Sequence, residues 1–118
     1  MIKPEEFWTL ARLLVEEKNA DEVRARTAAG RAYYALFLVL RPAVKRKWNI
    51  VIHDDYRGHG ELRRELKSRN LFKYADALDN WYRLREIADY KPEADVKSDD
   101  ILFAINRDQQ TLESALTL

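Results

Sequence analysis

The stretch Ala28-Ala-Gly-Arg-Ala-Tyr-Tyr-Ala-Leu-Phe-Leu-Val-Leu40 decides the fold of this chain. Apart from Arg31, its residues are nearly all small or apolar, so no wide polar face is left for solvent. A helix that is apolar on most sides lies in the centre of a bundle. We therefore predict a long central helix over about 20–46, which Pro42 should kink or end.

Helical periodicity marks the segments on both sides of this central helix. We predict four more helices, over about 4–18, 61–68, 71–89 and 99–116. In the first of them the expected buried stripe consists of Phe7, Leu10, Ala11 and Leu14. Residues 48–58 break the pattern and are predicted to form a loop with a short extended piece at 50–52. The expected fold is an all-α, up-and-down bundle of four to five helices.

The composition fits one domain spanning residues 1–118, because 118 residues with 47% hydrophobic content can form a single core. The net charge is only +1, so no overall field attracts nucleic acid or membrane, and any nucleic-acid contact needs a local basic patch. Cysteine is absent and there are two His, which excludes disulfides and leaves no zinc-ligand set. We expect no metal and no cofactor.

The chain shows no signal for export or for membrane insertion. Its first residues, Met1-Ile-Lys-Pro-Glu-Glu6, lack the apolar core of a secretory signal. The longest apolar run, Ala35–Leu40, is far too short to span a bilayer. We therefore expect a cytoplasmic protein that does not contact a membrane.

Arg31 is the first candidate functional residue, because it interrupts an apolar helix. Thr27, Arg31 and Tyr34 follow i, i+4, i+7 spacing and share one face. A buried guanidinium needs a partner, since its desolvation costs several kcal/mol. Arg31 is expected either to form a structural salt bridge inside the bundle or to contact an anion such as a phosphate.

A second set of candidates lies near the end of the helix predicted over 71–89. Arg85 and Asp89 stand at i, i+4 and are expected to pair. Asp89 and Tyr90 lie at the carboxyl end of the helix, where the macrodipole disfavours a negative charge. Such a carboxylate needs a further partner, and we expect that partner to be Arg31.

The loop contributes a third set of polar residues. Two His and two Asp fall within seven residues, namely His53, Asp54, Asp55 and His59. Such a set can perform acid–base chemistry or bind a metal. The plainer interpretation is a solvated polar loop, because polar clusters are what loops usually contain.

Two segments resemble motifs of the HEPN domain family. Arg26-Thr-Ala-Ala-Gly-Arg-Ala-Tyr-Tyr-Ala-Leu-Phe37 is similar to the family's S-R-A-Y-Y-A-x-F helix, and Leu84-Arg-Glu-Ile-Ala-Asp-Tyr90 is similar to its L-R-x-x-A-D-Y helix. The segments lie about fifty residues apart, as in the small stand-alone prokaryotic members. The resemblance covers most of the chain, from the second predicted helix to the fourth.

The resemblance implies a bundle of four or five helices that forms a homodimer, with the central helices of two protomers meeting at a cleft. It implies a role in a prokaryotic toxin–antitoxin or other defence system, with a small nucleotidyltransferase as a possible partner. The cleft would bind a nucleotide or RNA. Its expected lining consists of Arg31, Tyr34, Arg85, Asp89 and Tyr90.

Catalytic members of that family are metal-independent ribonucleases with an R-x(4–6)-H motif, which this chain departs from. Asp89 and Tyr90 stand where the ribonucleases place the His, and no His follows His59. RNA cleavage by acid–base chemistry needs a group that titrates near neutrality. We therefore expect a binding module. The alternatives are a ribonuclease toxin using Arg85 with His53 or His59, and a helical scaffold without a ligand site.

Overall fold

The computed structural model describes all residues from 1 to 118, as five helices and no strand. The helices are α1 (Pro4–Glu16), α2 (Glu22–Trp48), α3 (Gly58–Ser68), α4 (Phe72–Tyr90) and α5 (Ser98–Leu116). This confirms the predicted all-α bundle, and each helix end falls within three residues of its predicted position. None of the helices has the length and apolar character that a bilayer crossing requires.

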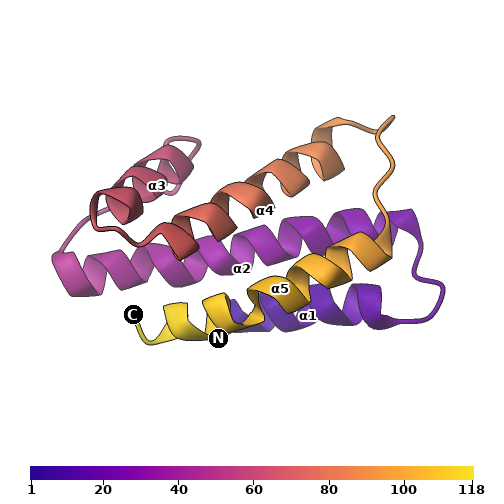
Figure 1. Ribbon diagram of the computed structural model, residues 1–118, viewed down its shortest axis with the longest axis horizontal. Coiled ribbons are helices and arrows are strands. Elements are labelled where there is room, and N and C mark those ends of the chain that lie inside the picture. Colours follow the sequence, from indigo (N-terminus) through magenta and orange to yellow (C-terminus); the bar gives the residue numbers. More distant parts are fainter.

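The longest helix, α2, is the central element. In Figure 1 it lies between α3 and α4 on one side and α1 and α5 on the other, and it contacts all four. Asp21 caps its first turn by accepting a hydrogen bond from the backbone N–H of Arg24. Fully buried alanines at 28, 32 and 35 let neighbouring helices approach closely, while Leu36 and Leu40 fill the core.

The prediction that α2 could end at Pro42 is wrong, because the helix continues to Trp48. Proline removes one N–H donor, whereas Ala43 and Val44 directly after it are fully buried and keep the last turns packed on the bundle. The helix ends at Asn49, whose backbone is left-handed with φ of 56° and whose N–H donates to the carbonyl of Lys45, while the next N–H, that of Ile50, donates to the carbonyl of Val44.

The short extended piece predicted at 50–52 forms no strand. No strand lies beside it to pair with its backbone. Instead the Ile52 side chain is buried, and Arg41 of α2 donates through Nε to the Ile52 carbonyl at 2.9 Å. The segment is therefore an irregular strap held against α2.

The buried face of α1 differs from the predicted stripe. Trp8, Ala11 and Val15 are buried, while Leu10 is 42% exposed. Trp8 takes the inward position because its indole Nε1 donates to Gln109 at 2.8 Å and its ring meets the edge of Trp81 with centroids 5.5 Å apart. These two contacts rotate α1 relative to the face that its aliphatic residues predict.

Candidate functional site

A cavity of about 850 Å³ lies between α2, α4, the start of α3 and the loop before it. All five residues of the expected cleft line this cavity: Arg31, Tyr34, Arg85, Asp89 and Tyr90. They come from two helices whose motifs lie about fifty residues apart in the chain. The packing of α4 along α2 thus brings both motifs to one place.

Arg31 is exposed on the α2 side of the cavity and forms no hydrogen bond or ion pair within the chain. The prediction of a buried Arg31 in a structural salt bridge with Asp89 is therefore wrong. The reason is that α2 is not covered all round: Thr27, Arg31 and Tyr34 follow an exposed stripe, on which Phe7 of α1 meets only the Tyr34 ring, with centroids 5.4 Å apart. An arginine on such a stripe keeps its hydration and needs no buried partner.

The predicted pair on α4 is confirmed. Arg85 Nε lies 3.4 Å from Asp89 Oδ2, and both side chains are partly exposed, so the pair adds little to stability. The Arg85 guanidinium also lies 5.6 Å from the centre of the Tyr33 ring. Tyr90 follows at the end of α4 with 69% of its surface exposed.

Tyr33 and His59 form the floor of the cavity, and a chain of polar side chains continues from them to Asp79 and Arg63, outside the lining. The Tyr33 hydroxyl lies 3.1 Å from His59 Nδ1, and His59 Nε2 lies 3.2 Å from Asp79 Oδ1. Arg63 Nε donates to the other Asp79 oxygen at 2.6 Å. With Nε2 donating to the carboxylate and Nδ1 accepting from the phenol, both ring nitrogens of a neutral His59 are satisfied.

The burial of the cavity floor determines the protonation states of His59 and Tyr33. Desolvation lowers the pKa of His59, against the opposing effect of the nearby Asp79 carboxylate. Burial likewise raises the pKa of Tyr33 far above its ordinary value. His59 is therefore neutral at neutral pH, and Tyr33 stays protonated.

Sequence reasoning missed Asp79 and Arg63, because both look like surface charges. The sequence did hold one indication of this arrangement: His59 and Arg63 are four residues apart on α3 and so share a face. Which carboxylate would meet that face depended on how α4 packs on α3, which the spacing does not show.

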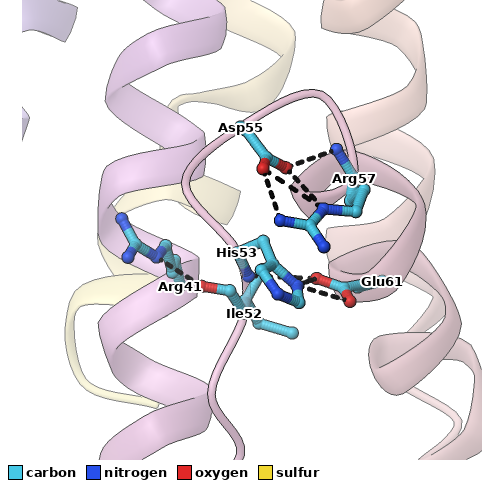
Figure 2. Close-up of polar contacts among 6 residues, drawn as sticks. All are labelled: Arg41, Ile52, His53, Asp55, Arg57 and Glu61. Atoms are coloured by element: carbon cyan, nitrogen blue, oxygen red, sulfur yellow. Dashed lines mark hydrogen bonds and ion pairs between the residues drawn. The ribbon is translucent and has the colours of Figure 1, made fainter.

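The loop before α3 is held by its own polar contacts (Figure 2). His53 Nδ1 lies 2.8 Å from Glu61 Oε2, and the His53 backbone N–H donates to Glu61 Oε1 at 3.0 Å. Asp55 accepts hydrogen bonds from the Arg57 side chain and backbone, which lower the pKa of Asp55 to about 2. No three acidic or His side chains converge to hold a metal ion.

The structure therefore places the two candidate His residues differently relative to the cavity. His59 lines the cavity together with Arg85, whereas His53 is not part of the lining. The loop stays close to α3 because Gly58 has no side chain: a Cβ there would lie 2.1 Å from the His53 carbonyl oxygen. Only His59 is placed to act on anything that the cavity binds.

Arg26 closes one end of the cavity. Its guanidinium donates to the carbonyls of Ala88 at 2.9 Å and Lys91 at 3.2 Å, and also to that of Ala94. These contacts cap the last turn of α4 and hold the turn after it. Arg26 thus supports the wall that carries Asp89 and Tyr90.

Comparison of the chain with models of protein families, with curated proteins and with solved structures gives no match in any of the three.

Proposed function

We propose that this chain is a HEPN-like helical module of the prokaryotic cytoplasm that binds a nucleotide or RNA in the cavity between α2 and α4. It acts as a homodimer within a toxin–antitoxin or other defence system, with a small nucleotidyltransferase as its candidate protein partner. The observation that carries the proposal is that the five residues selected by the two motifs all line one cavity.

The chemistry of the lining suits a ligand that is both anionic and aromatic. Arg31 has no partner within the chain, so its planar guanidinium is free to bind a phosphate in a bidentate way. Tyr34 and Tyr90, with 44% and 69% of their surface exposed, offer rings for base stacking. The lining carries four carboxylates and three guanidiniums, so its formal charge is slightly negative and binding of an anion relies on these directed contacts.

The exposed stripe of α2 supports the homodimer. It carries apolar Val23, 72% exposed, and Tyr34. On α1, which packs on α2, Leu10 and Leu13 are 42% and 59% exposed. A second copy of the chain would remove this apolar surface from water through a self-complementary contact.

Binding is tested by fluorescence anisotropy with a short, labelled single-stranded RNA. Arg31→Ala is expected to weaken binding about tenfold to a hundredfold, the effect of losing charged hydrogen bonds to phosphate. Arg64→Ala is the matched control, because Arg64 is exposed on α3, outside the cavity, and forms no hydrogen bond or ion pair within the chain. If Arg31→Ala and Arg64→Ala weaken binding equally, the cavity is not the binding site.

The homodimer is tested by sedimentation equilibrium. We expect the unaltered chain to sediment as a dimer and Val23→Arg to shift it to a monomer, because a charge on the stripe opposes burial. If the unaltered chain stays monomeric across the concentration range, the homodimer is refuted. The ligand site is then judged by the RNA measurement alone.

A metal-independent ribonuclease is the second candidate function, and one observation favours it: His59 shares the cavity with Arg85. RNA cleavage in the presence of a chelator, abolished by His59→Ala and unaffected by His53→Ala, would support it. Both ring nitrogens of His59 already have partners, so catalysis would require Tyr33 or Asp79 to release one. Absence of cleavage by the unaltered chain eliminates this candidate.

A further inference from the structure

We propose that the cavity selects guanine: the Glu86 carboxylate binds the Watson–Crick edge of the base while Arg31 binds the phosphate. This inference rests on the proposed function, because it names which nucleotide the same cavity accepts.

Glu86 is the carboxylate on the α4 wall that is left for a ligand. Asp89 is paired with Arg85, and Asp55 of the loop is paired with Arg57, whereas Glu86 forms no ion pair. Asp54 of the lining is also unpaired, but it lies in the exposed loop and not on a helix. Glu86 lines the cavity one turn after Tyr82 on α4. An unpaired carboxylate facing a cavity remains a strong acceptor for a donor that enters it.

The helix that carries Glu86 is packed against the start of α3. Glu86, one turn after Tyr82 on α4, raises the pKa of the Tyr82 phenol, so this phenol stays protonated beside the carboxylate. The Tyr82 ring is stacked on His59 at 4.0 Å, and His59 is anchored by Asp79. The α4 wall that carries Glu86 is thus held in place by packing on α3, which limits the ordering that binding requires and favours selective contacts.

Guanine is the base that matches a single carboxylate. Its N1–H and N2 amino group are adjacent donors, so one carboxylate accepts both in a bidentate pair. Adenine and cytosine present one exocyclic amino group beside a ring acceptor, and uracil presents one N–H between two carbonyls. Each of these three would place an acceptor close to a negative oxygen, which is unfavourable.

The unpaired charges of Arg31 and Glu86 then match the two ends of one ligand. A guanine nucleotide carries an anion at the phosphate and a donor edge on the base. The cavity offers the unpaired guanidinium of Arg31 on α2 and the unpaired carboxylate of Glu86 on α4. Its volume of about 850 Å³ lies within the range of small-ligand sites.

Isothermal titration calorimetry with 5′-GMP, 5′-IMP, 5′-AMP and 5′-UMP tests the selection. We expect GMP to bind at least about tenfold more tightly than AMP and UMP, with IMP in between because it keeps N1–H but lacks the amino group. Equal affinity for all four overturns the guanine inference while the proposed nucleotide site stands. If none of the four binds and RNA does not bind either, both proposals fail.

The role of Glu86 is tested with Glu86→Gln. The amide keeps one acceptor but turns a donor toward the base, so GMP affinity is expected to fall about tenfold to the level of AMP. The matched control is Glu93→Gln, in the exposed loop after α4 and outside the cavity, which should leave the GMP preference unchanged. A GMP preference that survives Glu86→Gln in a protein with an unaltered circular dichroism spectrum refutes the assignment to Glu86.

A free mononucleotide and an unpaired residue in RNA present the same guanine edge. Five-residue RNAs with a single central G or A, in a background of U, separate the two sources. Tighter binding of the G oligonucleotide than of GMP identifies RNA as the ligand. Binding of GMP with no measurable binding of either oligonucleotide identifies the free nucleotide.

Discussion

The imidazole of His59 lies flat against the phenol ring of Tyr82, with ring centroids 4.0 Å apart and planes 20° apart. The contact joins α3 to α4 at the floor of the cavity. Tyr33 of α2 meets both rings, at 5.8 Å from His59 and 5.6 Å from Tyr82. Three helices therefore meet in one aromatic cluster, in which the His59 ring is tied to Asp79.

Acidification is expected to destabilise the protein through His59. Burial lowers its pKa, so the unfolded chain takes up a proton at a higher pH than the folded chain does. The stabilising contribution is complete above the ordinary histidine pKa of about 6.5 and is lost as the pH falls from there through the folded-state pKa. The melting temperature should fall between about pH 7.5 and pH 5.5, and His59→Gln should reduce that slope.

The control for this effect is His53→Gln, which removes the other His of the chain. His53 is paired with Glu61 outside the cavity floor, and its side chain is 47% exposed. A pH slope that persists in His59→Gln but disappears in His53→Gln would show that the loop, and not the floor, responds to acid.

Gly58→Ala is expected to destabilise the fold by about 1–3 kcal/mol, the usual cost of overpacking. The new Cβ would lie 2.1 Å from the His53 carbonyl oxygen and 2.9 Å from the Phe37 ring, so backbone must move. Urea unfolding measures the change. Gly60→Ala is the matched control two residues further along α3: its Cβ meets nothing within 4 Å, and alanine there should stabilise the helix by about 0.5–1 kcal/mol.

Arg26→Ala is expected to cost about 2–3 kcal/mol of unfolding free energy, because several backbone carbonyls after α4 lose a charged donor. The Arg26 side chain is only 17% exposed, so water replaces it incompletely. Arg64→Ala should change stability by less than about 0.5 kcal/mol, as surface substitutions usually do. Equal stability of Arg26→Ala and Arg64→Ala, measured by urea unfolding, would contradict a capping role for Arg26.

Asp108 is the one charged residue buried in the core, and its partner Trp81 is fully buried. The Trp81 indole donates to Asp108 Oδ2 at 2.8 Å. Trp81→Phe removes this donor and leaves a cavity, so we expect a loss of about 2–4 kcal/mol. Thermal unfolding in the Asp108→Asn background checks the pairing: additive losses would show that the two residues do not act together.

The positions of the helices were predictable because they depend on local pattern. The i, i+4 pairing of Arg85 and Asp89 was predictable for the same reason, since one helix fixes both positions. The buried face of α1 was not predictable in this way, because two overlapping sets of residues on α1 are apolar. Trp8 was selected over Leu10 by partners on α4 and α5, to which local pattern gives no access.

Arg31 is a second case, at the candidate site, in which the sequence predicted the helix face of a residue but not its surroundings. Its place on one helix face with Thr27 and Tyr34 followed from helical spacing. Its place in a motif followed from the sequence. Whether that face is covered depends on how the other four helices distribute around α2. They leave it open, and a residue expected to be buried and paired is exposed and unpaired.

The sequence by itself determined the five helices, the central place of α2 and the two motif helices on which the candidate residues lie. Only the tertiary structure decided which side chains meet in the cavity. Tyr33, His59 and Asp79 are separated by 26 and 20 residues, yet they form one hydrogen-bonded chain. Helix periodicity fixes neighbours within a helix, whereas contacts between helices depend on burying the apolar surface of the whole chain at once.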